Sequence, residues 1–187
     1  STPIKSSAAS DVYKRQGLSK EELMQRGVKI GADVPYCIMR GTALAEGIGE
    51  QLTALPPMVK CPILIAKPQI SVSTKFVYEN LKLDADTVHP DIDGLIGAIR
   101  AKNLEQIAGH MGNVLETVTI PNYPVIAEIK EHMMEHGAVH AMMSGSGPTV
   151  FGLFENRTAA REAQRRIREK SLAGQVYVTS IHGVRRN

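Results

Sequence analysis

The chain has 187 residues, of which 43% are hydrophobic, and its formal net charge is +3 at pH 7. This length is enough for one complete domain and part of a second, since domains usually run to about 100–200 residues. The mild charge and the scarcity of aromatic residues argue against a nucleic-acid partner. No window is apolar enough to cross a membrane and no secretory pattern opens the chain, so we expect a cytoplasmic protein without a membrane partner.

The first sixteen residues differ in character from the rest. Ser6–Gln16 resembles, codon for codon, the translation of a transposase-based sequencing adapter. We therefore expect residues 1–16 to be an artefactual or disordered head, and we expect the remainder to be the carboxy-terminal part of a longer protein.

From residue 17 to the Pro56-Pro57 pair, the pattern predicts one short helix followed by three strands. Ser19, followed by two glutamates, is typical of a helix N-cap. The strands, which glycines separate, are predicted over residues 36–39, 42–46 and 51–55. The two prolines break the pattern, so we predict that residues 17–57 end an amino-terminal domain and that residues 58–184 form a carboxy-terminal domain.

The second domain is predicted to alternate strands and helices in the order strand, helices, strand, strand, helix, strand. Strands are predicted at 61–66, 139–143, 150–154 and 175–181, and helices at 75–81, 93–101, 103–116, 124–136 and 157–170. This is the split βαβ order of ferredoxin-like domains, so the fold class is α+β. The arginine-rich helix at 157–170 is expected to present a solvated face, and Cys37 and Cys61 are expected to be buried free thiols.

Two short segments carry possible chemistry. Ser144, Gly145, Ser146 and Gly147 lie between two apolar runs, where small residues and several N–H groups at one bend can form an anion-binding nest or a plain hairpin. Asp33 precedes Val34-Pro35 at a turn, where its carboxylate can accept a proton from a substrate hydroxyl or can satisfy local N–H groups. The residues alone leave both pairs of alternatives open.

Taken together, three segments resemble the GHMP small-molecule kinases. They are Gly31–Pro35, Gly41–Glu50 and Ser144–Phe151, and the resemblance extends from Gly17 to about His182. It implies the end of an amino-terminal GHMP kinase domain followed by a ferredoxin-like domain. It also implies phosphorylation by ATP of an alcohol group on a small molecule. Within the superfamily, the segments look like the branch that acts in isoprenoid biosynthesis on methylerythritol linked to cytidine diphosphate.

The resemblance also implies roles for individual residues. Asp33 would be the general base that takes the proton from the 2-hydroxyl of the substrate. Ser144–Gly147 would support the phosphate site, Thr74 would lie near the sugar, and the ring of Tyr78 would stack on cytosine, although Tyr78 can equally be a buried helix residue. Mg²⁺ would arrive with ATP, held largely by phosphate oxygens. No metal site of the protein is predicted, and the spacing of His132 and His136 indicates surface histidines rather than zinc ligands.

The family's amino-terminal lysine and glycine-rich triphosphate loop have no counterpart in this sequence. Because phosphoryl transfer depends on positioning and charge neutralisation, the chain by itself is expected to be inactive. Two alternatives stay open: another GHMP small-molecule kinase, or a non-catalytic ferredoxin-like binding domain. The oligomeric state does not follow from the sequence.

Overall fold

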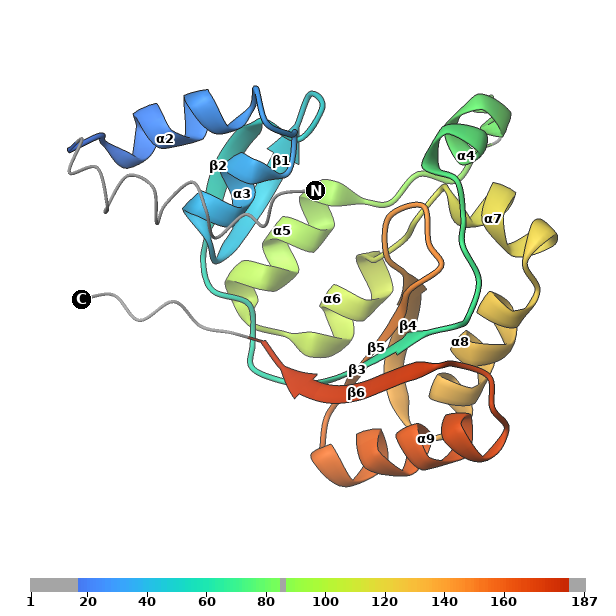
Figure 1. The fold of residues 1–187 in the computed structure, drawn as a ribbon. Coiled ribbons are helices and arrows are strands. Elements are labelled where there is room, and N and C mark those ends of the chain that lie inside the picture. The colour runs from blue at the N-terminus through green and yellow to red at the C-terminus, as the bar shows by residue number, and fades with distance from the viewer. Residues whose placement is uncertain (1–16, 85–86, 182–187) are drawn as a thin grey trace. The chain divides into compact units, whose positions relative to one another are not determined.

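The computed structural model describes residues 17–84 and 87–181. The predicted head at 1–16 and residues 182–184 of the predicted second domain lie outside this part. The described chain divides into two compact units, residues 17–57 and residues 58–181. Figure 1 gives the order of helices and strands along the chain.

The first unit holds two helices and a two-stranded antiparallel sheet. Its elements are α2 (Lys20–Gly27), α3 (Val34–Met39), β1 (Thr42–Glu46) and β2 (Gln51–Leu55). The predicted helix start is confirmed, because the Ser19 hydroxyl accepts from the Glu22 N–H and the Glu22 carboxylate accepts from the Ser19 N–H. The last two predicted strands are confirmed with their bounds.

The strand predicted at 36–39 is wrong, because these residues belong to α3. Pro35 lies in the first turn of that helix, where a missing N–H costs no hydrogen bond. The helix ends where Arg40 and Gly41 take positive φ values of 60° and 89°. Cys37 lies on α3 and is exposed, which contradicts its predicted burial, whereas Cys61 is buried as expected.

The second unit is built on a four-stranded antiparallel sheet. Its strands are β3 (Pro62–Lys67), β4 (Ala138–Met143), β5 (Val150–Phe154) and β6 (Gln175–Ser180), and they lie in the order β4-β5-β3-β6. Because the first strand of the unit lies between the third and the fourth, this is the strand order of a ferredoxin-like sheet. The predicted α+β class is confirmed.

Six helices complete this unit in the described residues. They are α4 (Thr74–Asn80), α5 (Ile92–Ala101), α6 (Leu104–His110), α7 (Glu116–Asn122), α8 (Val125–Glu135) and α9 (Arg157–Glu169). The single helix predicted over 103–116 is wrong, because α6 ends at His110 and α7 begins at Glu116. Gly109 and Gly112 weaken a helix there, and the Asn113 side chain accepts from the Leu115 N–H instead.

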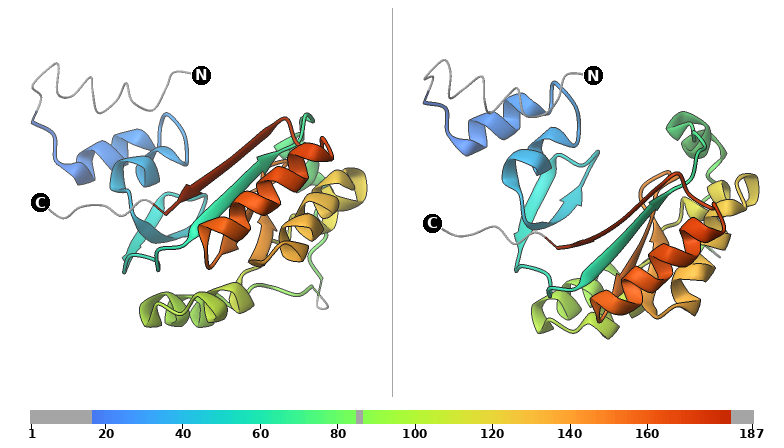
Figure 2. Two further views of the ribbon diagram at one scale, coloured as in Figure 1. Left: turned by 90° about the horizontal axis from the view of Figure 1, so that it is seen from below. Right: turned by 60° about the horizontal axis from the view of Figure 1, so that its bottom comes forward.

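Alternation along the strands separates two apolar layers. Leu64 and Phe154 point to the main core, where α8 and α9 pack together on one face of the sheet with Ile129 and Ile167 fully buried (Figure 2). Ile63 lies on the other face, toward α5 and α6. The outer side of α9 carries ion pairs that join Arg165 and Arg166 to Glu162 and Glu169, which agrees with a solvated face. In the described residues, no helix is long and apolar enough to cross a membrane.

Candidate active site

The loop Ser144–Gly147 joins β4 to β5, the two strands that pair at one edge of the sheet (Figure 1). The Ser144 N–H donates to the Thr149 carbonyl at 2.8 Å, and the Gly147 N–H donates to the Ser144 carbonyl at 3.0 Å. Gly147 has φ +88°, and a Cβ there would lie 2.7 Å from the sulfur of Met143. The turn therefore requires glycine at this position for two separate reasons.

The loop leaves backbone donors free. No described residue accepts from the N–H groups of Gly145 or Ser146. Successive free N–H groups at a bend can bind an anion, as in a nest. The geometry thus keeps the anion-binding alternative available for a loop that is also a hairpin connection.

Thr74 and Tyr78 lie on α4, whose N-cap is Ser73. The Thr74 hydroxyl is 2.9 Å from the Ser146 hydroxyl, so two residues predicted for the site are in contact. Tyr78 is four residues further along the same helix face and is 60% exposed. The alternative that Tyr78 is a buried helix residue is therefore wrong, and its ring is accessible for stacking.

Asp33 lies in the first unit, immediately before α3. Its side chain makes no capping hydrogen bond to the helix, and the residue is exposed. No described residue forms an ion pair or hydrogen bond with its carboxylate. The alternative of an aspartate that satisfies local N–H groups is therefore wrong, and the carboxylate is free to accept a proton.

Three polar side chains that hold the loop were not predicted. Asn113, Glu116 and Thr119 all bond to the backbone of residues 143–146. They recur every third residue, while the intervening Leu115 and Val118 are buried in the core. That polar spacing within an apolar segment was the available signal in the sequence.

The histidines do not form a metal centre in the part of the chain that is described, where no group of three or more His, Cys, Asp or Glu side chains could hold an ion. His132 is only 7% exposed, so its predicted surface position is wrong. Its Nδ1 lies 2.9 Å from the Glu128 carbonyl, and its ring stacks with that of His136. Burial and the nearby Lys130 ammonium lower the pKa of His140, although the Glu116 carboxylate opposes them.

Comparison with known proteins gives close relatives. The chain is 62% identical over 158 residues to a 4-diphosphocytidyl-2-C-methyl-D-erythritol kinase of Lachnospira eligens, a match that covers 84% of this chain and 55% of the relative. It is 61% identical over 145 residues to the kinase of the same name from Lachnoclostridium phytofermentans, which covers 78% of this chain and 50% of that relative. Residues 95–171 match the family described as GHMP kinases C terminal. This part of the chain is a GHMP kinase C-terminal domain.

The fold of this chain is similar to that of GHMP kinases among the solved structures. A crystal structure of 4-(cytidine 5'-diphospho)-2C-methyl-D-erythritol kinase superposes with a TM-score of 0.78 at 24% identity, covering 97% of this chain and 63% of that one. The chain spans about half the length of the curated relatives it matches. The matched family range contains the loop and its three holding side chains, whereas Asp33, Thr74 and Tyr78 lie outside it.

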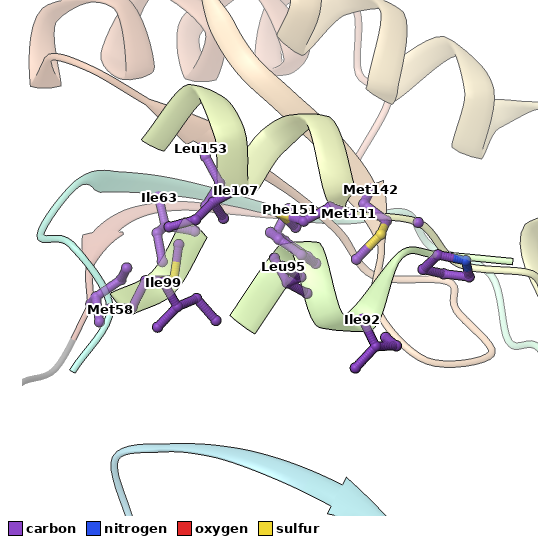
Figure 3. A pocket seen from close by; sticks show the side chains of 13 residues that line it. Met58, Ile63, Ile92, Leu95, Ile99, Ile107, Met111, Met142, Phe151 and Leu153 are labelled. Carbon is purple, nitrogen blue, oxygen red and sulfur yellow. The ribbon is translucent and has the colours of Figure 1, made fainter. Parts of the chain in front are cut away.

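A large apolar cavity lies within the second unit. It has a volume of about 290 Å³ and lies between the sheet and helices α5 and α6 (Figure 3). Ile63, Phe151, Leu95, Ile99 and Ile107 are among the side chains that line it. None of the predicted site residues lines the cavity, so it is not part of the candidate active site.

Proposed function

We propose that this chain forms part of a kinase that transfers the γ-phosphate of ATP to the 2-hydroxyl of 4-diphosphocytidyl-2-C-methyl-D-erythritol. The observation that carries this proposal is the 62% identity to the Lachnospira eligens kinase of that name. We place the activity in isoprenoid biosynthesis and in the cytoplasm. Residues 17–57 would end the amino-terminal GHMP kinase domain, and residues 58–184 would form the carboxy-terminal domain.

The geometry of individual residues supports their proposed roles. Asp33 has an exposed carboxylate without a described partner, as a general base for the substrate hydroxyl requires. Ser144–Gly147 offers free N–H groups for phosphate oxygens, which carry the charge in phosphoryl transfer. Thr74 contacts this loop through Ser146 and is proposed to lie beside the sugar. The exposed ring of Tyr78 is proposed to stack on the cytosine.

ATP is the proposed phosphate donor, and Mg²⁺ is proposed to arrive bound to its phosphate oxygens. The described side chains provide no cluster that would hold the ion by themselves. We therefore assign no step to a protein-bound metal. The residues of this chain supply the proton acceptor, the substrate contacts and the backbone donors.

A chimera tests the proposal directly. In it, residues 17–187 replace the matched part of the Lachnospira eligens kinase, which supplies the rest of the enzyme. We expect ATP-dependent formation of the phosphorylated cytidyl substrate, and Asp33→Asn should lower kcat by at least about a hundredfold, the smallest usual contribution of a general base. A folded chimera that phosphorylates homoserine or mevalonate instead would favour another GHMP kinase. One with no transfer to any of the three would favour a non-catalytic domain.

A further inference from the structure

Side chains from a segment thirty residues away hold the backbone of the β4–β5 loop. The Asn113 amide donates twice, to the Met143 carbonyl at 2.9 Å and to the Gly145 carbonyl at 2.8 Å. The Thr119 hydroxyl donates to the Ser146 carbonyl at 3.3 Å. One side of the turn is thus bonded to residues 113–119.

These bonds engage the carbonyl groups of the loop but not all of its N–H groups. The carbonyls of Met143, Gly145 and Ser146 accept from side chains, and the carbonyl of Ser144 accepts from the Gly147 N–H. Four carbonyl oxygens, which would repel an anion, are therefore engaged within the protein. The N–H groups of Gly145 and Ser146, which attract an anion, have no acceptor in the described residues.

The holding side chains are themselves fixed. The Asn113 side-chain oxygen accepts from the Leu115 N–H at 3.0 Å, so a single amide uses both of its donors and its acceptor. Thr119 is fully buried. Glu116 accepts from the Met143 N–H at 2.7 Å and also pairs with Lys130 on α8. Each of these groups is thus held by a further bond or by burial while it bonds to the backbone of residues 143–146.

We infer that Asn113, Glu116 and Thr119 are positioning residues that hold Ser144–Gly147 as a phosphate-binding turn. They touch no substrate and act through the carbonyls and the Met143 N–H that they engage. The inference rests on the proposed function in one respect, which is that the bound phosphate belongs to ATP. The claim that these side chains fix the conformation of the loop is independent of the proposed function.

The chain offers two matched pairs of variants. Asn113→Asp removes both amide donors, and its control is Asn122→Asp, since Asn122 lies on α7 and, among the described residues, donates to the Val118 carbonyl alone. Thr119→Val removes the buried hydroxyl with little change of shape, and its control is Thr117→Val, since Thr117 donates to the Val114 carbonyl. In the described structure, the hydrogen bonds of both control side chains go to carbonyls outside the loop.

The first readout is amide NMR of the full chain titrated with inorganic pyrophosphate. We expect saturable shifts of the Gly145 and Ser146 amides in the unmodified chain and in both controls. Asn113→Asp and Thr119→Val should move the Gly145 and Gly147 signals before any ligand is added, and should weaken pyrophosphate binding about fivefold or more, as for a lost hydrogen bond. Thr119→Ser, which keeps the hydroxyl, should show the glycine signals and the pyrophosphate affinity of the unmodified chain.

The second readout is the chimera, in which the two test variants should lower kcat/KM for ATP by about ten- to a hundredfold through misplacement of the loop, while the controls leave it unchanged. Unmoved glycine signals in both test variants, or no saturable shift in the unmodified chain, would overturn the inference. If Asn113→Asp does not fold, the Thr119 pair decides. If the chimera is inactive but Asn113→Asp still shifts the loop signals and weakens pyrophosphate binding, the proposed function is refuted and the positioning role is kept.

Discussion

The pair between Glu116 and Lys130 offers a quantitative test of the packing beneath the loop. Their side chains are only 17% and 24% exposed, and the Glu116 carboxylate also accepts from the Met143 N–H. Breaking a fully buried pair costs about 3–5 kcal/mol, whereas an exposed pair is worth about 0–1 kcal/mol. Because both side chains are mostly removed from water, we expect Glu116→Gln and Lys130→Met each to lower the free energy of unfolding by about 2 kcal/mol, between these two limits.

A double-mutant cycle in urea separates the pair from its surroundings. Because the double variant leaves no unpaired charge, its loss should be smaller than the sum of the single losses by about 1–2 kcal/mol. The exposed pair of Lys75 and Glu79, with side chains 83% and 61% exposed, is the control, and Lys75→Met should cost about 0.5 kcal/mol or less. If the Glu116 and Lys130 effects add to within about 0.5 kcal/mol, the reasoning from burial is refuted.

Three further predictions concern the loop, the half-buried His140 and the proposed contact of Tyr78 with cytosine. Gly147→Ala, which combines positive φ with a close sulfur, should lower the free energy of unfolding by about 1–3 kcal/mol in urea, whereas Gly145→Ala, with φ +57° and open space, should cost about 1 kcal/mol. Because folding lowers the pKa of His140 below 6.5, the neutral imidazole favours the folded state, and this contribution to the free energy of unfolding should be complete above pH 6.5 and be lost as the pH falls through the lowered pKa. Lys130→Met removes a nearby positive charge and should raise the pKa of His140 in an NMR titration. In the chimera, Tyr78→Leu should raise KM for the cytidyl substrate about five- to a hundredfold and leave KM for ATP unchanged, while Tyr78→Phe keeps the wild-type value.

Local signals in the sequence account for most of the second unit. Alternating apolar residues and glycine or proline breaks located its strands. The structure has helices near the predicted starts at residues 75 and 103, and Ser73 and Asn103 cap them, each with a side-chain oxygen that accepts from the backbone three residues on. Pro35 was ambiguous, because proline favours an extended residue before it and also suits the first turn of a helix. Burial of Val34 and Pro35 in the first unit agrees with the helix.

The break between α6 and α7 shows where local signals stop. The sequence predicted that a helix begins at residue 103, but the end of this helix depends on Asn113, whose amide bonds to carbonyls about thirty residues later in the chain. A helix continued through residue 113 would carry this side chain away from those carbonyls. The same tertiary bonds thus decide both the secondary structure of 111–115 and the polarity of the loop.

Serine and glycine permit the β4–β5 turn, but they do not by themselves produce the arrangement of N–H and carbonyl groups on which the proposed anion binding depends. A hairpin of the same residues with exposed carbonyls would present to a phosphate both N–H groups, which attract it, and carbonyl oxygens, which repel it. Here the order of the sheet brings β4 beside α6 and α8, and α7 comes between these helices in the chain. Side chains of residues 113–119, which lead into and begin α7, therefore reach the carbonyls, and the N–H groups of Gly145 and Ser146 have no acceptor in the described residues. The chemistry of this loop is set by the segment that holds it, so replacing Asn113 should change phosphate binding without altering any residue of the loop.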